Sequence, residues 1–269
     1  MWTFRRSLLI FIVVSWLLAS CTGLPELGRR NEQDGSQAAY QAAMAPSQRD
    51  LPDQLPPLPD YRMDVQVDPV KPLLTGRLTL TVPPEPDGSL LPEYYFRLYP
   101  NLNYYGGSMS IGLATVNGAG APFDYHASDT AVRVVVPPGA TTPGEPVAIG
   151  LQWRLRPPVW DDERYHLIGA SGGVLALPAF YPMLAVRDAD APEGWRLDVS
   201  MLQGDSAFTP AATYLVTTTV PVTYQIAATG SVLGTQDAPA PAVDGEQPAA
   251  GGSWKAWRMA SGPAREFAM

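Results

Sequence analysis

The sequence has one cysteine, Cys21, and two histidines, His126 and His166. A disulfide bond within the chain is therefore excluded. A catalytic zinc helix of the His-Glu-x-x-His type needs a pair of histidines four residues apart. Neither histidine has a second one at that spacing. We therefore expect no zinc site, no catalytic residues and no cofactor in this chain.

Basic residues are also scarce, with 18 Lys and Arg against 26 Asp and Glu, which gives a formal net charge of −8. Nucleic acids and anionic lipids attract basic surfaces. An electrostatic nucleic-acid partner is therefore not expected.

Motifs for other catalytic chemistry are incomplete. The glycine-rich run Gly169 to Gly173 does not match Gly-x-Ser-x-Gly, because Gly172 directly follows Ser171. A serine triad with either histidine is formally possible, but the sequence places no serine and carboxylate beside them, so we interpret them as surface or loop histidines. The acidic run Asp161 to Arg164 lacks the alternate spacing of a calcium loop and is interpreted as solvated charge.

The longest apolar run, Ser7 to Ala19, follows Arg5 and Arg6 and ends just before Cys21. It is too short for a membrane-spanning helix, which takes about 20 apolar residues. Residues 1–20 are thus predicted to be a secretory signal peptide. Leu18 to Cys21 resembles the bacterial lipobox, which implies lipid on Cys21. We expect an exported protein, lipid-anchored to the cell membrane or outer membrane and facing outside the cytoplasm.

Residues 21–59 are rich in Pro, Gln and Ala and have few residues for a core. Such a composition is typical of a flexible tether. As a coil it would reach roughly 30–40 Å.

From residue 60 the chain shows short β-rich runs bounded by Pro, Gly, Asn and Asp. Asn117-Gly118 predicts a type I′ turn, and residues 237–252 predict a disordered loop inserted between two strands. We therefore predict an all-β fold, an antiparallel β-sandwich or saddle-like sheet system over residues 60–269. The expected strands are Tyr61 to Val67, Leu78 to Val82, Tyr94 to Tyr99, Met109 to Val116, Ala131 to Val136, Val147 to Leu155, Trp195 to Leu202, Tyr214 to Val220, Tyr224 to Val232 and Trp254 to Met259.

Aromatic clusters at Tyr94 to Phe96 and at Tyr104-Tyr105 allow two interpretations. They could form a surface that stacks on carbohydrate or peptide, but at strand spacing such residues more often pack in the core. We expect the core.

The order of motifs in residues 60–269 resembles the N-terminal β-domain of aminopeptidase N-type (gluzincin) zinc metallopeptidases, in particular their bacterial lipoprotein members. The resemblance rests on Tyr61 to Val67, Leu74 to Leu80, Tyr95 to Asn101, Gly144 to Trp153, Ala179 to Met183, Trp195, Gly204-Asp205, Ala211 to Tyr214, Pro221, Ala228 to Gly230 and Ala264 to Met269.

The resemblance implies a non-catalytic domain that supports and partly caps a catalytic domain absent from this chain. Zinc and the peptide substrate would belong to that catalytic domain, and the full-length parent would be a zinc aminopeptidase. Ser171 to Leu177 lacks the Gln or Glu with which the family binds the substrate amino group, so no substrate-binding residue is assigned. The alternative is a stand-alone envelope lipoprotein whose β-sandwich binds a peptide, a glycan or a protein.

Overall fold

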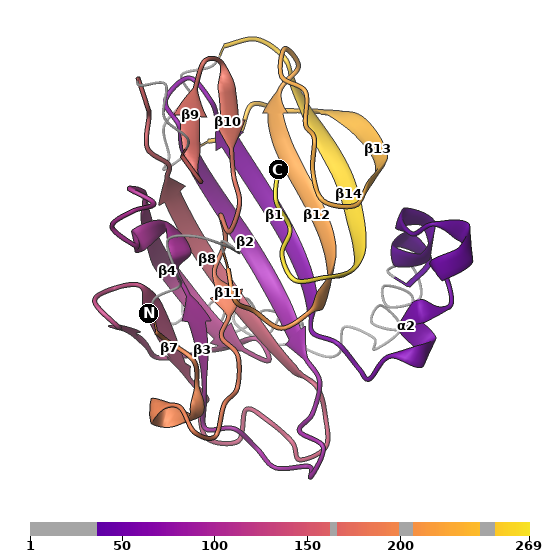
Figure 1. Ribbon diagram of the computed structural model, residues 1–269, viewed down its shortest axis with the longest axis vertical. Helices are drawn as coiled ribbons and strands as arrows, with labels where there is room; N and C mark the ends of the chain where they lie inside the picture. Colours follow the sequence, from indigo (N-terminus) through magenta and orange to yellow (C-terminus); the bar gives the residue numbers. More distant parts are fainter. Residues whose placement is uncertain (1–36, 162–165, 199–206, 243–250) are drawn as a thin grey trace, which may run out of the picture. The chain divides into compact units, whose positions relative to one another are not determined.

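The computed structural model describes residues 37–161, 166–198, 207–242 and 251–269 (Figure 1). The predicted signal peptide, Cys21 and residues 162–164 of the acidic run lie outside the described residues. None of the helices in the described part is long and apolar enough to cross a membrane. The described body is built from strands, and the prediction of an all-β fold is confirmed.

The largest sheet has eight strands in the order β13-β14-β12-β1-β2-β8-β4-β5. Its strands are β1 (Asp60–Asp68), β2 (Leu73–Val82), β4 (Ser108–Val116), β5 (Ala119–Gly120), β8 (Val147–Arg156), β12 (Ala212–Pro221), β13 (Ser231–Ala238) and β14 (Trp254–Ala264). Strands β1 and β12 run parallel, whereas the other neighbours run antiparallel. The sheet is therefore mixed, which the sequence patterns did not indicate.

Two smaller sheets accompany it. A four-stranded antiparallel sheet has the order β11-β3-β7-β6, and a short hairpin pairs β9 with β10. Their strands are β3 (Glu93–Arg97), β6 (Phe123–His126), β7 (Ala131–Val135), β9 (Gly169–Ser171), β10 (Val174–Ala176) and β11 (Met183–Leu184). There are also short 3₁₀ turns η1 (Pro46–Gln48), η2 (Tyr99–Asn101) and η3 (Pro192–Gly194) and the helix α2 (Leu51–Gln54).

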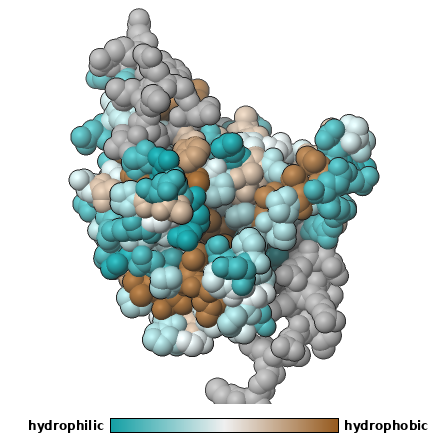
Figure 2. Space-filling view, turned by 60° about the horizontal axis from the view of Figure 1, so that its bottom comes forward, coloured by the Kyte–Doolittle hydropathy of each residue, from teal (hydrophilic) through white to brown (hydrophobic). Residues whose placement is uncertain are grey.

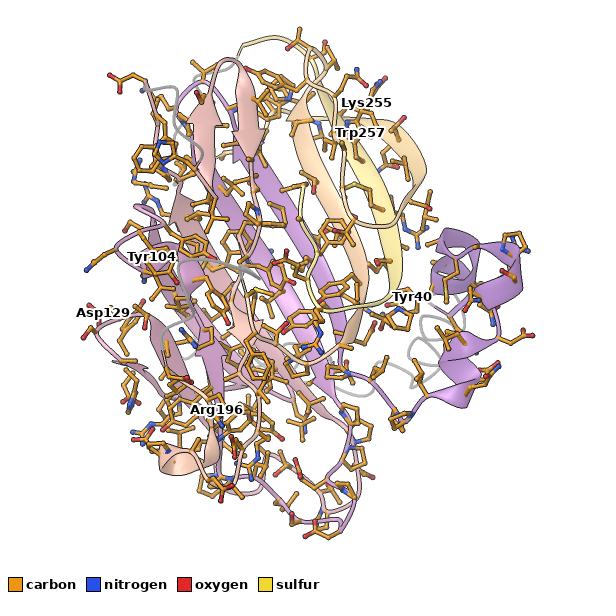
Figure 3. All side chains as sticks on the ribbon, viewed as in Figure 1. Tyr40, Tyr104, Asp129, Arg196, Lys255 and Trp257 are labelled. Atoms are coloured by element: carbon orange, nitrogen blue, oxygen red, sulfur yellow. The ribbon has the colours of Figure 1, made fainter. Side chains whose placement is uncertain are left out.

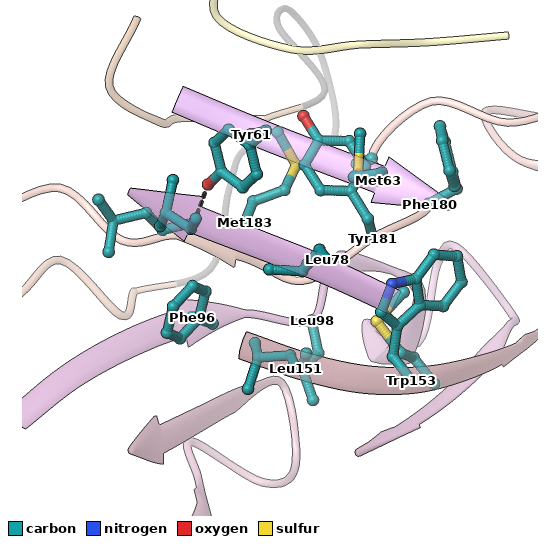
Figure 4. Packing of buried hydrophobic residues seen from close by; sticks show 14 of the residues in the cluster. Tyr61, Met63, Leu78, Phe96, Leu98, Leu151, Trp153, Phe180, Tyr181 and Met183 are labelled. Carbon is teal, nitrogen blue, oxygen red and sulfur yellow. Dashed lines mark hydrogen bonds between the residues drawn. The ribbon is translucent and has the colours of Figure 1, made fainter. Parts of the chain in front are cut away.

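The core lies between one face of the large sheet and the smaller sheet. Alternation along β1 sends every second residue inward, because successive side chains of a strand point to opposite faces. These inward residues are Tyr61, Met63, Val65 and Val67. Figure 4 shows Tyr61 and Met63 beside Met183 and Tyr181, and the Tyr61 hydroxyl accepts a hydrogen bond from the Leu184 amide at 2.8 Å. This bond ties the two layers together.

Gly76 of β2 is needed for the packing of Trp153. The two residues are cross-strand partners, and a Cβ atom on Gly76 would lie 2.2 Å from the Trp153 ring. The indole therefore lies directly over the glycine, an arrangement that fills the space left by a missing side chain.

Residues 37–43 form helical turns that pack on the outer face of the large sheet. Ala39 and Tyr40 are buried against Ala260 of β14, and the Tyr40 hydroxyl hydrogen-bonds the Asp60 carboxylate (Figure 3). Ser231 donates to the Ala43 carbonyl at 3.2 Å. Part of the segment predicted to be a flexible tether is thus packed against the β-sheet.

Two expected strands are wrong. Trp195 to Leu202 forms no strand in its described part, because turn η3 directly precedes it and Trp195 makes only an isolated bridge to Arg187. Within Tyr224 to Val232, pairing begins only at Ser231. The predicted Asn117-Gly118 turn is confirmed, with φ values of 48° and 83°.

The predicted core position of the aromatic clusters is confirmed. Tyr94, Tyr95, Phe96 and Tyr105 are buried, and Tyr104 packs against the core from a partly buried position. Residues 237–252 do connect two paired strands, β13 and β14. Asp237 and Ala238 still belong to β13, and residues 243–250 of the predicted loop lie outside the described residues.

Candidate functional site

Charged residues gather on the outer face of the four-stranded sheet. Asp124 and His126 are alternate residues of β6, so their side chains point to the same face. Arg133 of β7 is the cross-strand partner of both Asp124 and Tyr95. Strands β3, β7 and β6 are in register at these positions. The side chains of Tyr95, Arg133, Asp124 and His126 therefore lie on the same face of the sheet.

His126 lies between two carboxylates. Its Nε2 atom is 2.6 Å from Asp124 Oδ2, and its Nδ1 atom is 3.9 Å from Glu193 Oε2. Arg133 Nε donates to Asp124 Oδ1 at 3.0 Å. Asp124 is therefore shared by a guanidinium and an imidazole, while Glu193 stays outside hydrogen-bond distance of the ring.

The surroundings shift the pKa values of two groups in this cluster, the Asp124 carboxyl and the Tyr95 hydroxyl. Partial burial would raise the pKa of the Asp124 carboxyl, but the hydrogen bonds from Arg133 and His126 outweigh it and hold the pKa below its usual range. Burial and, after it, the neighbouring Glu193 carboxylate raise the pKa of the Tyr95 hydroxyl. Tyr95 therefore stays protonated.

The segment after β11 crosses this face and contributes Glu193. The Ala185 amide donates to the Tyr95 carbonyl at 2.8 Å, and the Arg187 guanidinium lies 4.9 Å from the centroid of the Trp195 ring. Further along, Arg97 Nη1 donates to the Asp198 carbonyl at 2.6 Å. The segment is thus held at several points over the sheet.

The backbone around the cluster has unusual conformations. Ala127, Ser128 and Asp129 have φ values of 50°, 55° and 63°, and Glu193 has 58°. Non-glycine residues rarely adopt this left-handed region, and each costs of order 1–3 kcal/mol. The three residues that follow His126, and Glu193 itself, are therefore held by surrounding contacts rather than by local preference. Figure 3 labels Asp129 in this turn.

A pocket of about 460 Å³ opens between the His126 turn and the crossing segment. Figure 3 labels Arg196 at its rim, where Arg196 pairs with the Asp188 carboxylate. Trp195, by contrast, is buried at the base. The other lining residues are His126, the three acidic residues Asp190, Glu193 and Asp198, and four apolar ones, Ala127, Ala191, Pro192 and Leu197.

The sequence analysis assigned no role to this cluster. It interpreted His126 as a surface or loop histidine, whereas His126 ends strand β6 and is only 24% exposed. The alternation of Asp124 and His126 is the sequence signal that could have indicated their pairing. Glu193 had no such signal, because it lies far away in the chain. His166 stacks on Trp160 with the ring centroids 3.7 Å apart.

Catalytic machinery is not assembled by the described residues. No group of three or more His, Cys, Asp or Glu side chains among them could hold a metal ion. The partners of the His126 ring are the Asp124 and Glu193 carboxylates. Gly169 to Gly173, the nearest approach to a nucleophile motif, forms strand β9 and the turn of its hairpin.

The outer face of the large sheet carries a second hollow, of about 670 Å³. Alternate polar residues of neighbouring strands line it in two cross-strand rows. These residues include Asp64, Gln66, Thr75, Arg77, Ser110, Gln152, Arg154, Thr217 and Thr219. Trp153 also borders the hollow, but its ring lies over Gly76 and is buried.

An apolar edge lies at the β9–β10 hairpin. Val159 bridges to Ala170 of β9, and Val174 of β10 pairs with Ser171. Their exposed fractions, 67% and 66%, are the largest of any large apolar side chain in the described residues. We call Val159 and Val174 the hairpin edge.

Comparison with known proteins finds no matching family model and no matching curated protein. Solved structures do match. The M1 zinc metallopeptidase from Deinococcus radiodurans shares 18% identity, with 79% of this chain and 42% of that chain covered and a TM-score of 0.44. The chain is similar to part of an M1 zinc metallopeptidase.

Two further structures agree with this match. Legionella pneumophila aminopeptidase A in complex with aspartic acid has 13% identity and a TM-score of 0.45, with 78% of this chain and 20% of that chain covered. Yeast LTA4 hydrolase in complex with bestatin has 9% identity and a TM-score of 0.39, over 78% and 28% of the two chains. This chain spans less than half the length of the structures that it matches.

Proposed function

We propose that this chain is the lipid-anchored, non-catalytic β-domain of a zinc aminopeptidase-like protein, and that it supports and partly caps a catalytic domain. Zinc and the peptide substrate would be bound by that catalytic domain. Lipid on Cys21 would hold the protein on the outer side of a cell-envelope membrane.

The observation that carries the proposal is the hairpin edge. Single exposed apolar residues are normal on protein surfaces, but Val159 and Val174 flank the same short strand and both leave about two thirds of their area in water. A partner that covers them would gain roughly 25 cal/mol for each Å² of apolar surface buried. A neighbouring domain of the same protein fits an edge that exposes apolar side chains.

The test begins with the coding sequence 3′ of the Met269 codon, in which we expect a Gly-x-Met-x-Asn motif and a His-Glu-x-x-His helix. The domain encoded there is then produced separately, and its affinity for the present full chain in detergent is measured by calorimetry. Replacing both Val159→Asp and Val174→Asp should weaken binding at least about tenfold, as the loss of buried contacts at an interface does.

Val70→Asp is the matched control, because Val70 is 58% exposed in the turn between β1 and β2. It should bind like the wild type. A coding sequence without these motifs, or equal binding by the double variant and the wild type, would contradict the proposal.

The hollow on the large sheet favours a second candidate, a stand-alone envelope lipoprotein that binds a glycan or a peptide there. Its support is the arrangement of Thr, Gln and Arg side chains in two rows over several strands. Under this candidate Arg77→Ala should abolish binding of an envelope ligand, while the hairpin-edge variants should have no effect.

A further inference from the structure

We propose that the hollow on the outer face of the large sheet binds an anionic polysaccharide, a chain of sugar rings that carry carboxylates. The inference deepens the second candidate function above and rests on the site named there. It does not depend on the proposal of an aminopeptidase-like protein, because the hairpin edge contributes no residue to the hollow.

The hollow is locally basic, although the whole chain has a formal net charge of −8. Arg77 and Arg154 line it, and Asp64 is the one acidic side chain among its described lining residues. A third guanidinium, that of the exposed Arg258, stands beside it, because Arg258 is the cross-strand partner of the lining residue Thr217. The field in the hollow therefore attracts anions.

Arg77 can bind an anion without giving up another contact. It is exposed, and within the described residues its guanidinium forms neither an ion pair nor a hydrogen bond. Arg154 on β8 is its diagonal neighbour, since Arg77 pairs with Gln152. Such neighbours lie about 7–8 Å apart, a separation that two long side chains can bridge. Both arginines can therefore reach one carboxylate, which a planar guanidinium binds through two parallel hydrogen bonds.

Hydrogen-bonding side chains extend the site across five neighbouring strands, β12, β1, β2, β8 and β4 (Figure 1). They form two cross-strand rows, the first of Thr217, Asp64, Arg77 and Gln152 and the second of Thr219, Gln66, Thr75, Arg154 and Ser110. Neighbouring strands are about 4.8 Å apart, so a ligand lying across them meets one polar side chain at each strand. Hydroxyl, amide and guanidinium groups supply the donors and acceptors that sugar hydroxyls need.

The same spacing favours a sugar chain over a peptide. An extended peptide presents side chains on one face only about every 6.6 Å, which does not match the distance between strands. A chain of pyranose rings advances by nearly one strand spacing for each ring. A peptide also cannot join the sheet by backbone pairing here, because β1, β2 and β8 already have a partner strand on each side.

Apolar contacts contribute little to this site. Figure 2, which brings the lower end of the molecule forward, shows hydrophobic patches among hydrophilic residues on the face that it draws. In the hollow, by contrast, the large apolar side chains of the described lining, Val65 and Trp153, are buried. The Trp153 ring is thus not available to stack on a sugar ring. Affinity must come from hydrogen bonds and charge, which selects a carboxylated chain over a neutral one.

The test uses the full chain in detergent micelles and three probes of six units each: hexamannuronate, which has a carboxylate on every ring, neutral mannohexaose and hexa-L-glutamate. Calorimetry measures the three affinities. We expect saturable binding of hexamannuronate, about tenfold or more tighter than that of mannohexaose, as the loss of a charged hydrogen bond predicts. Hexaglutamate should bind more weakly than hexamannuronate. Raising the salt concentration should weaken hexamannuronate binding, because salt screens exposed charges.

Two variants should change the affinity for hexamannuronate in opposite directions. Arg77→Gln keeps a polar side chain and removes the charge, so it should weaken binding about five- to tenfold, the range for one exposed charged partner. Asp64→Asn removes a like charge beside the ligand and should strengthen binding about two- to fivefold. Arg265→Gln is the matched control, because Arg265 is exposed and lies outside the described lining. It should bind like the wild type.

Any of four results would overturn the inference. Hexamannuronate that does not bind removes its ligand. Equal affinity for mannohexaose would leave the second candidate function standing but exclude the anionic class. Equal or tighter binding of hexaglutamate would indicate a peptide ligand or general attraction of polyanions. Equal affinity of the Arg77→Gln and Arg265→Gln proteins would place the ligand elsewhere.

These outcomes are separate from the test of the aminopeptidase-like proposal, which measures binding of another domain at the hairpin edge. Loss of folding is also distinguished from loss of binding. Thermal unfolding of the Arg77→Gln and Asp64→Asn proteins should remain cooperative, since both side chains are exposed. Unfolding would moreover weaken binding in both variants, whereas the inference requires Asp64→Asn to bind more tightly.

Discussion

At the scale of single residues, Gly76 and Trp153 show how one missing side chain determines packing. The indole occupies the space that a Cβ atom on Gly76 would fill. We predict that Gly76→Ala destabilises the protein by about 1–3 kcal/mol, the usual cost of overpacking a core. Denaturant unfolding followed by tryptophan fluorescence measures this loss.

Gly112→Ala is the control, because a Cβ atom on Gly112 of β4 would meet nothing within 4 Å. It should leave stability unchanged or slightly increased. Combining Gly76→Ala with Trp153→Leu should cost less than the sum of the two single changes, since the clash needs both side chains. Strict additivity would show that the indole does not lie over the glycine.

Asp124 links stability to pH. Because its pKa in the folded protein lies below the unfolded value of about 3.9, its favourable contribution is present above that pH and is lost as the pH falls through the lowered pKa. Asp124→Asn should lower the melting temperature at pH 7 and flatten its decrease below about pH 4. The side chain is 47% exposed, so we expect an effect under about 1 kcal/mol.

Circular dichroism melts between pH 2.5 and pH 7 measure the effect. Asp64→Asn serves as the comparison, because Asp64 is exposed and has no ion pair in the described structure. If both variants kept the acid dependence of the wild type, the pairing of Asp124 with Arg133 and His126 would contribute nothing to stability.

At the scale of elements, residues 37–43 belong to the folded body rather than to a free linker. Tyr40 is buried, hydrogen-bonds Asp60, and shares that carboxylate with Thr213 at 2.7 Å. Burial and, after it, Asp60 raise the pKa of the Tyr40 hydroxyl, so it remains a donor. The contact connects the segment before the sheet to strands β1 and β12.

We therefore predict that Tyr40→Phe destabilises the protein by about 1 kcal/mol, the typical net value of one hydrogen bond. Proteases should also cut more quickly between residues 37 and 59, because the segment would detach more often. Limited proteolysis with mass spectrometry measures the rate. Tyr224→Phe, whose partly exposed hydroxyl forms no recorded hydrogen bond, should behave like the wild type. An unchanged cleavage rate in Tyr40→Phe would contradict the conclusion that Tyr40 holds residues 37–43 against the large sheet.

The strands were predictable where alternation and turn residues agreed. β1, β2 and β8 follow their apolar alternation within a few residues, because one face of each strand is buried by the core. The described part of the expected strand at 195–202 pairs only through the Trp195–Arg187 bridge after turn η3, and the one at 224–232 pairs only from Ser231. Local patterns contain no information on which distant strands become neighbours.

The candidate site shows the same limit. Asp124 and His126 could have been paired from their spacing on one strand, but Glu193 reaches them only through the path of the segment after β11. The parallel pairing of β1 with β12 could likewise not be predicted from turn residues, because no short connection joins the two strands. Both contacts depend on how distant segments of the chain are arranged in the fold, which local sequence motifs do not specify.

At the scale of the whole molecule, the proposed lipid anchor would depend on the Cys21 thiol alone. Under this proposal, Cys21→Ser should abolish labelling by a fatty-acid analogue and shift the protein to the aqueous phase in detergent partitioning. Adding Ser47→Cys to Cys21→Ser should not restore the label, because only a cysteine after the signal segment is a substrate. Equal partitioning of wild type and Cys21→Ser, with no label on either, would show that the Ser7 to Ala19 segment remains uncleaved as the anchor.

The parallel pairing of β1 with β12 has a consequence for how the chain folds. Asp60 and Thr213, which are neighbours across these strands, are separated by 153 positions in sequence. Hairpins such as β1–β2 can close quickly, but the two halves of the large sheet join only when these distant strands meet. Until then β1 presents an unpaired edge to other chains. We expect the search for this one pairing to set the folding rate, and a newly synthesised chain to need protection from aggregation during that interval.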